Sequence, residues 1–250
     1  MNIQNNQLYL GVIKIWNISI LELYINSIKS FLENKNADCN TLFSIVHPVK
    51  DFNLSSILKQ IQKEKDVFFF GERPDENFSF LGVDSVFNIC IQGEDRVSET
   101  AEVVKTIEKN FVSNWKDYDL SLPLFLGGMK FSVDKSDELW SGYSDSDWFI
   151  PKFLFLIIDN NPFFAYNTFS NSCDESKLQE ELNRAFELIN QTDVNGGEII
   201  NSILSTNKDE ISEKLRWDAN VNEALKRIES GEVQKIVLSR QIQIELSHQR

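Results

Sequence analysis

The chain has 250 residues, and its 42% hydrophobic and 25% charged residues are typical of a folded protein with a sizeable core. Lysine and arginine number 25 against 38 aspartates and glutamates, so the formal net charge is −13 at pH 7. Phosphate recognition needs a basic surface, and this acidic balance therefore argues against nucleic acid or an anionic membrane as a partner.

Cysteine and histidine are too sparse for a structural zinc site. The chain has no CxxC pair, and the residues of these two types are Cys39, Cys90, Cys173, His47 and His248. An odd number of scattered cysteines fits a reducing compartment. The N-terminus lacks a basic segment followed by an apolar one, and apolar runs such as residues 153–158 are far shorter than the ~18 residues of a membrane span. We expect a soluble, cytoplasmic protein.

The first half of the chain contains predicted helices and strands in irregular order. Apolar residues at helical spacing predict helices over residues 18–34, 54–65 and 94–116, and Asn53 or Ser55 can cap the second helix. Short apolar runs predict strands over residues 41–46, 67–70, 78–91 and 123–133, with a turn at 71–76 and an interruption near Gly82 and Asp84. Gly127 and Gly128 lie inside the last strand, which indicates a bulge or a close approach of backbone.

The second half continues with two strands, over residues 148–158 and 162–170, which meet at Asn160–Asn161. Helices are predicted over residues 175–191, 198–205 and 208–230, and Gly231 lies where a helix C-cap glycine is expected. In the last helix the stripe expected to be buried consists of Trp217, Val221, Leu225 and Ile228. Residues 232–246 alternate apolar and polar side chains, as a strand does.

The order of these elements predicts the fold class and the domain division. Several predicted strands follow one another without an intervening helix, which favours an α+β fold over a regular βαβ array. The polar stretch 192–197 is the best candidate for a linker. We therefore expect one domain over residues 1–197 and the start of another over residues 198–250.

Three segments resemble binding sites at first sight, and all three have simpler explanations. An acidic loop carries Asp134, Asp137, Glu138, Asp145 and Asp147, but its spacing does not fit an EF-hand, so a solvated surface loop is expected. Gly127-Gly128 belongs to neither phosphate-binding glycine pattern, and the charged residues 72–76 predict a turn with a local ion pair. The two histidines, His47 and His248, do not support a Ser/His/Asp or Cys/His catalytic site.

Lys235 lies in the terminal predicted strand. Side chains alternate between the faces of a strand, so Lys235 lies on the more polar face, between Val233 and Val237. A solvent-facing lysine is the simpler interpretation. If the strand lines a cleft, however, the amine could serve as a general base.

Three segments, in this order along the chain, resemble the isochorismate synthase family of chorismate-binding enzymes. The first is FFFGERP at residues 68–74, and the second is PLFLGGMKF at residues 123–131, followed by Trp140, Trp148 and FIPK at 149–152. The third runs from Trp217 to Arg240 and includes KIVLSR at residues 235–240. Each segment alone is a weak signal, but the order and spacing of all three agree over roughly the whole chain.

This resemblance implies a fold and a reaction. The fold is of the anthranilate synthase component I type, with large antiparallel sheets and helices packed outside, and residues 198–250 would begin its chorismate-binding catalytic region. The implied reaction converts chorismate to isochorismate by adding water at C2 and expelling the C4 hydroxyl, with Mg²⁺ holding the substrate carboxylate. The lysine that matches Lys235 is the general base that activates the water.

The identity of residue 235 narrows the choice within the family. Relatives that add ammonia carry glutamine at the matching position, and ammonia is a competent nucleophile without a strong base. Water at neutral pH benefits from a positioned base, so Lys235 favours a water-adding enzyme. Salicylate synthases share this lysine and remain an alternative, as does a non-catalytic domain of the same fold. The pathway and the oligomeric state stay open.

The resemblance also places essential groups after Lys235. The family's acid glutamate, magnesium-binding glutamates and substrate-carboxylate contacts lie beyond this lysine, and the chain ends at Arg250. We therefore expect the catalytic region to be truncated, with the Mg²⁺ ligands in the absent part and the 250-residue chain inactive by itself. Apolar residues of the terminal strand, such as Ile236 and Leu238, should then be poorly buried or covered by another copy of the chain.

Overall fold

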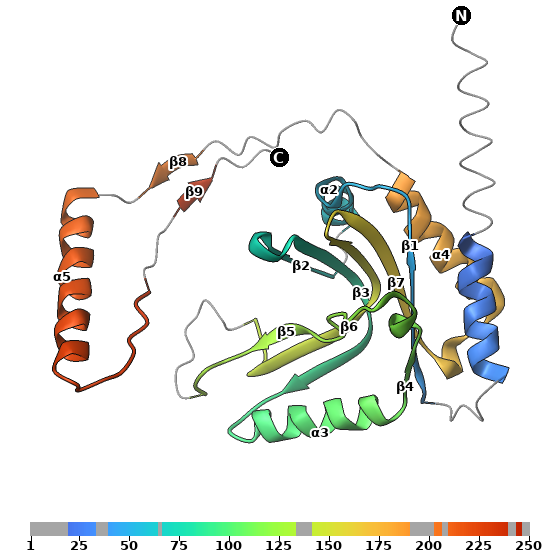
Figure 1. The fold of residues 1–250 in the computed structure, drawn as a ribbon, viewed down its shortest axis with the longest axis horizontal. Helices are drawn as coiled ribbons and strands as arrows, with labels where there is room; N and C mark the ends of the chain where they lie inside the picture. Colours follow the sequence, from blue (N-terminus) through green and yellow to red (C-terminus); the bar gives the residue numbers. More distant parts are fainter. Residues whose placement is uncertain are drawn as a thin grey trace, which may run out of the picture. The chain divides into compact units, whose positions relative to one another are not determined.

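The computed structural model describes residues 20–33, 40–64, 67–133, 142–190, 203–206, 210–239 and 244–246 (Figure 1). The chain divides into two compact units, Met1–Val194 and Asn195–Arg250. The predicted linker at 192–197 lies outside the described residues, so the domain boundary after residue 197 stays a prediction.

A seven-stranded sheet forms the centre of the first unit. Its strands are β1 (Leu42–Pro48), β2 (Phe68–Arg73), β3 (Phe78–Ile91), β4 (Phe111–Ser113), β5 (Leu126–Met129), β6 (Ser146–Ile158) and β7 (Asn161–Phe169). The order is β2-β3-β6-β7-β1-β4, and β5 pairs with β6. Every pair is antiparallel except β1 with β4, which is parallel. This mixed sheet with separate helices confirms the predicted α+β class.

Helices cover one face of the sheet. The helix over residues 20–33, α2 (Leu54–Glu64) and α4 (Glu175–Asn190) pack their apolar stripes against β1, β6 and β7 (Figure 1). The core residues of this layer include Tyr24, Ile57, Phe155, Phe164 and Phe186, all nearly inaccessible to solvent. Asn53 caps α2 as predicted, because its side-chain oxygen accepts the backbone N–H of Ser56 at 3.0 Å.

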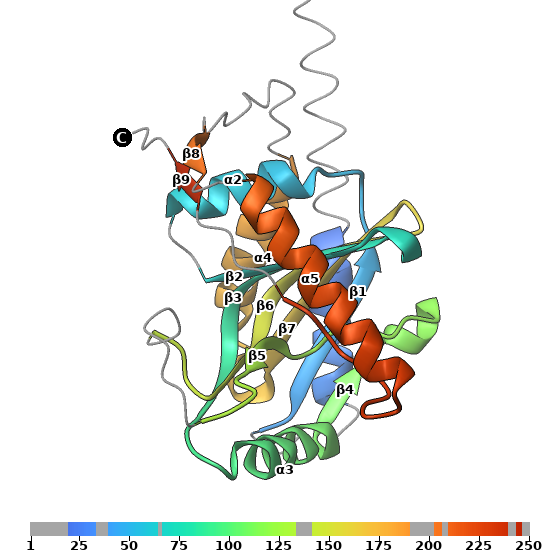
Figure 2. The ribbon, with the colours of Figure 1, turned by 90° about the vertical axis from the view of Figure 1, so that its left-hand side faces the viewer.

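On the opposite face of the sheet, no α-helix among the described residues of the first unit packs against the apolar cluster around Leu154 and Leu156. This cluster is built from strand residues, covered by the segment that contains Trp115, Tyr118 and Leu122. Several aromatic side chains of this face remain half-buried, namely Phe69, Phe78, Phe80, Phe149 and Phe163. The helix α3 (Arg96–Lys109) lies at one end of the sheet, next to β4 (Figures 1 and 2).

Two irregularities appear where the sequence pattern indicated them. Asp84 has a positive φ of 58°, and the β3–β6 register shifts between Ser85 and Phe87, so β3 is one strand with a bulge. The β6–β7 hairpin turns at Asp159 and Asn160, whose φ values of 49° and 63° suit a two-residue turn. The turn is one residue earlier than predicted.

The helix predicted over 94–116 is wrong at its C-terminal end. The helix α3 ends at Lys109, and Phe111–Ser113 forms β4, parallel to β1. The side-chain amide of Asn114 extends this pairing, because it donates to the carbonyl of Val46 and accepts the N–H of Val46, both at 2.8 Å. Pairing with a strand distant in sequence overrides the helical spacing of the apolar residues. Likewise, β2 continues to Arg73, into the predicted turn.

The second unit contains α5 (Glu210–Glu229) and the antiparallel pair β8 (Ile203–Thr206) and β9 (Ile244–Leu246). Gly231 caps α5 as predicted, with φ 76° and its N–H bonded to the carbonyl of Ile228 at 3.0 Å. The helix predicted over 198–205 is wrong at residues 203–205, which pair with β9 instead.

The apolar pattern of the second unit led to two further errors. Of the strand predicted over 232–246, the described residues include a strand at Ile244–Leu246, residues 233–239 have no regular secondary structure, and residues 240–243 lie outside the described residues. In the predicted buried stripe of α5, Leu225 and Ile228 are 50% and 38% exposed. Apolar spacing indicates which side chains tend to be buried. In the second unit, however, the described residues bury little of the apolar face of α5. Leu238 is likewise 36% exposed, as expected for a poorly buried terminal segment.

His47 occupies a buried position on β1 that ties together elements far apart in the chain. Its Nδ1 shares a hydrogen bond of 2.8 Å with the Tyr118 hydroxyl, and its ring contacts the edge of Tyr24 at 4.9 Å between centroids. Its Nε2 is buried without a hydrogen-bond partner among the described residues. Burial lowers the pKa of His47 below its ordinary value, although the nearby charge of Asp117 acts in the opposite direction.

We predict that His47 makes the fold less stable in mild acid. The pKa of His47 is lower in the folded state than in the unfolded state, where it is about 6.5. As the pH drops through this value, the imidazole therefore takes up a proton in the unfolded state first. Proton uptake stabilises the unfolded state, so the free energy of unfolding falls. The melting temperature should therefore fall less between about pH 7.5 and pH 5.5 in His47→Gln than in the parent chain. An equally steep fall in the variant would contradict this role.

Candidate functional site

A cleft of about 810 Å³ opens beside half-buried aromatic side chains of the sheet face opposite α2 and α4. It lies entirely within the first unit, and its volume is in the range of small-molecule sites. Three segments line it: Val67 to Phe69 at the start of β2, Gly127 to Ser132 along and after β5, and Tyr143, Ser144, Asp147 and Phe149 along and before β6. The second of these segments contains the glycine pair singled out in the sequence.

The two glycines of β5 have different roles. Gly127 has a φ of 151°, and a Cβ atom there would lie 2.1 Å from the carbonyl oxygen of Asp147 and 2.7 Å from Cα of Trp148. A side chain is therefore excluded by backbone, which confirms the predicted close approach. A Cβ at Gly128 would meet nothing within 4 Å. Gly128 thus leaves space open where it lines the cleft.

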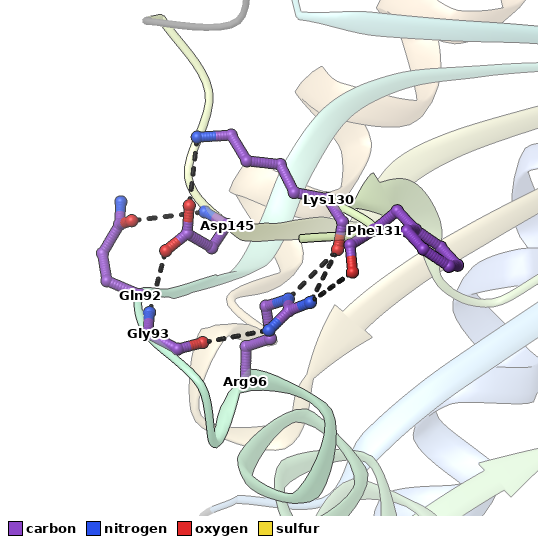
Figure 3. Close-up of polar contacts among 6 residues, drawn as sticks. All are labelled: Gln92, Gly93, Arg96, Lys130, Phe131 and Asp145. Carbon is purple, nitrogen blue, oxygen red and sulfur yellow. Dashed lines mark hydrogen bonds and ion pairs between the residues drawn. The ribbon is translucent and has the colours of Figure 1, made fainter. Parts of the chain in front are cut away.

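Arg96 holds the segment that follows β5 (Figure 3). Its side chain comes from the first turn of α3, and the residue is only 8% exposed. The guanidinium donates to the carbonyl of Lys130 through Nε at 3.1 Å and through an Nη at 3.0 Å, and to the carbonyl of Phe131 at 2.9 Å. It also donates to the carbonyl of Gly93 at 3.3 Å. The buried Arg96 guanidinium therefore fixes the backbone of Lys130 and Phe131, and the Phe131 ring projects from this backbone into solvent.

Asp145 fixes the same segment from the other side (Figure 3). Its carboxylate accepts the N–H of Gly93 at 2.8 Å and pairs with the Lys130 ammonium at 3.0 Å. These contacts lower the pKa of Asp145 below its ordinary value, first through the Gly93 N–H and then through Lys130. The expectation of a solvated acidic loop is therefore wrong for Asp145, whose side chain is 14% exposed.

The other acidic residues of that loop divide into two groups. Asp134, Asp137 and Glu138 lie outside the described residues. Asp147 is half-buried on β6, lines the cleft, and accepts a weak hydrogen bond from the Cys90 thiol at 3.6 Å. Partial burial and the Asp147 charge raise the pKa of Cys90, which keeps the thiol protonated and unreactive near neutral pH.

A second group of charged residues joins α4 to the helix-covered part of the sheet. Lys152 on β6 pairs with Glu181 at 3.0 Å and with Asp84 at 3.2 Å, and the Tyr166 hydroxyl also donates to Glu181. Burial tends to lower the pKa of Lys152, but the two carboxylates outweigh it and the pKa is raised. These charges satisfy one another, so the group stabilises the packing of α4 rather than offering a reactive side chain.

The residues singled out in the sequence fall in different parts of the structure. Gly127 and Gly128 form the cleft, and the predicted ion pair of residues 72–76 is present between Arg73 and Glu76 at 3.0 Å. Lys235 is exposed in the irregular segment after α5, in the second unit. Its role as a general base stays a prediction.

Arg96 was missed in the sequence. Its position in the first turn of α3 could have drawn attention to it, because the helix dipole there favours acidic residues and a cation is unusual.

The family resemblance implies a Mg²⁺ site, which needs a group of carboxylate side chains close together. Among the described residues, no group of three or more histidine, cysteine, aspartate or glutamate side chains is placed to hold a metal ion. The acidic residues near the cleft already bind Lys130, Gly93 and Cys90. The described residues near the cleft therefore do not fit a magnesium site.

A family model and a solved structure match the chain. The sequence model of a family described as "Chorismate binding enzyme" matches residues 26–250. Among solved structures, MenF, the menaquinone-specific isochorismate synthase from Escherichia coli, matches with a TM-score of 0.35 and 12% identity, covering 66% of this chain and 33% of that one. The matched part thus spans about a third of the solved enzyme.

Neither a curated relative of the chain nor a membrane-spanning helix among its described residues is found. No curated protein sequence matches the chain. Among the helices that the structure describes, none combines the length and the apolar character needed to cross a bilayer.

We predict that the two glycines of β5 respond oppositely to the same change. Gly127→Ala should lower the free energy of unfolding by about 3 kcal/mol or more, because the added methyl group would meet the β6 backbone. Gly128→Ala should change it by no more than about 0.5 kcal/mol, since the methyl group meets open space. Urea unfolding of both variants measures this difference, and equal stabilities would show that the close approach is not a constraint.

We also predict that Arg96 stabilises the loop that borders the cleft. Arg96→Ala leaves the carbonyls of Gly93, Lys130 and Phe131 without their charged donor and should cost about 2–4 kcal/mol. Arg73→Ala is the matched control, because Arg73 forms an exposed ion pair and its loss should have little effect on stability. If both variants unfold at the same urea concentration, the Arg96 contacts contribute nothing net.

Proposed function

Because the chain belongs to the chorismate-binding enzyme family, we propose that it serves in an isochorismate synthase, converting chorismate to isochorismate. The observation that carries the proposal is the family match, which extends over residues 26–250 and includes Lys235. The resemblance found in the sequence is thereby confirmed at the level of the family. The choice of this reaction within the family rests on the chemistry of residue 235.

The proposed reaction is an isomerisation in which water enters and water leaves. The oxygen of the incoming water bonds to C2 of chorismate, the ring double bond shifts, and the bond from C4 to its hydroxyl breaks. One proton leaves the attacking water, and another is needed by the departing hydroxyl group. A base on one side and an acid on the other therefore lower the barrier without a change of oxidation state.

Lys235 is proposed as the base that removes the proton from water. An amine can do this when it is neutral and within hydrogen-bond distance of the water. The residue is exposed at the surface of the second unit and is not part of the cleft described above. Its lysine identity supports water over ammonia as the nucleophile, since ammonia needs no base.

Salicylate synthase is the second candidate, because enzymes of that type carry the same lysine. Both would consume chorismate, but they differ in their products. Product analysis therefore separates them: isochorismate alone supports the first reaction, and salicylate with pyruvate supports the second. Release of anthranilate or aminodeoxychorismate would contradict the argument from Lys235.

We predict that Lys235→Ala lowers chorismate turnover by about 10²–10⁴-fold, the usual contribution of a positioned general base. The assay uses the complete polypeptide that the gene encodes, with residues 1–250 alone as a second sample for which no turnover is expected. The melting temperature of the variant should be unchanged, because Lys235 is exposed. Lys214→Ala, which removes an exposed lysine from α5, is the matched control.

Two outcomes would count against the proposal. A stable Lys235→Ala enzyme with more than about a tenth of the parent activity would remove this lysine from the mechanism. A complete polypeptide that is folded but leaves chorismate unchanged would contradict the enzyme function itself.

A further inference from the structure

We propose that the cleft between β2, β5 and β6 binds a small organic cation, namely an amine attached to an apolar or aromatic ring. The inference concerns the first unit alone and does not depend on the proposed reaction. It rests on three properties of the lining: aromatic surface, a carboxylate that forms no ion pair, and a backbone frame that keeps the cleft open.

Aromatic rings dominate the lining. Phe68, Phe69, Phe131, Tyr143 and Phe149 all contribute to it, together with the apolar side chains of Val67 and Met129. Phe131 is fully exposed, and Tyr143 is 59% exposed. A group of exposed apolar side chains marks a surface that contacts a ligand or another molecule, and the hollow between these rings favours a small ligand. The faces of such rings carry partial negative charge and attract cations.

The charges of the lining favour a cation as well. Lys130 and Asp147 are the charged residues among the described residues that line the cleft. The Lys130 ammonium is already offset by Asp145 at 3.0 Å, whereas the Cys90 thiol that Asp147 binds carries no positive charge. Asp147 forms no ion pair among the described residues, so its carboxylate attracts an ammonium group and repels a carboxylate on a ligand.

The cleft is formed before any ligand arrives. Arg96 binds the carbonyls of Lys130 and Phe131, and Asp145 binds Lys130 and Gly93, so the backbone at the rim is held on both sides (Figure 3). Gly128 adds no side chain to the hollow. A preformed site loses little conformational entropy on binding, which suits a small ligand with few contacts.

Three compounds with the same benzyl or phenyl ring and different charge test the proposal by calorimetric titration. Benzylamine should bind the chain at about 1:1 stoichiometry, with a dissociation constant near the millimolar range expected for so small a molecule. Benzyl alcohol should bind about 10-fold more weakly, and benzoate more weakly still. Equal or tighter binding of benzoate, or no binding of benzylamine, overturns the proposal.

Variants then locate the binding in the cleft. Asp147→Asn keeps the oxygen that Cys90 contacts but removes the charge. The affinity for benzylamine should therefore fall about 5–10-fold, while the affinity for benzyl alcohol stays unchanged. Asp75→Asn, at an exposed carboxylate outside the lining, is the control and should change neither. Gly128→Phe should abolish binding of both compounds by filling the hollow without a backbone clash.

The variants also provide the outcomes that would refute the site. An unchanged preference for benzylamine in Asp147→Asn, or full binding in a folded Gly128→Phe chain, places the ligand elsewhere. Chorismate carries two carboxylates and should not displace benzylamine. The result is therefore independent of chorismate turnover, and either proposal can fail without the other.

Discussion

The pairing of β6 is the constraint on which the rest of the first unit depends. Along one edge β6 pairs with β3, while its other edge is divided: β7 uses residues 153–158, and β5 uses residues 146–149. The hydrogen-bonding groups of a strand edge can be used only once, so β5 can join the sheet only where β7 has ended. This division places Gly127 against the β6 backbone and opens the cleft beside it.

Much of the fold follows from local pattern in the sequence, because strong apolar periodicity shows both the type of an element and the face that it buries. The helices over 20–33, 54–64 and 175–190 and the strands β3, β6 and β7 were expected from spacing alone. The errors arise where a distant partner decides the structure. Phe111–Ser113 leaves a helical pattern for a place beside β1, and residues 203–205 pair with β9. Spacing within a segment carries no information on such partners.

The candidate sites show the same limit in chemical terms. The glycine pair pointed to a close approach because glycine is rarely placed inside a strand without one. Arg96 and Asp145 gave no comparable signal, since their burial depends on carbonyl and N–H groups contributed by other segments. Lys235 was selected by family resemblance and by the chemistry of water as a nucleophile. Its exposed, irregular surroundings would not have identified it.

The left-handed turn at Asp159 and Asn160 has a consequence for the order in which the sheet can assemble. It joins β6 and β7 through the shortest connection in the sheet, so this hairpin forms at the smallest cost in loop-closure entropy. By contrast, Leu42 pairs with Phe169 and with Phe111, and each of those contacts closes a long stretch of chain. Pairing of β1 with the edge of this hairpin therefore costs more loop-closure entropy than forming the hairpin itself.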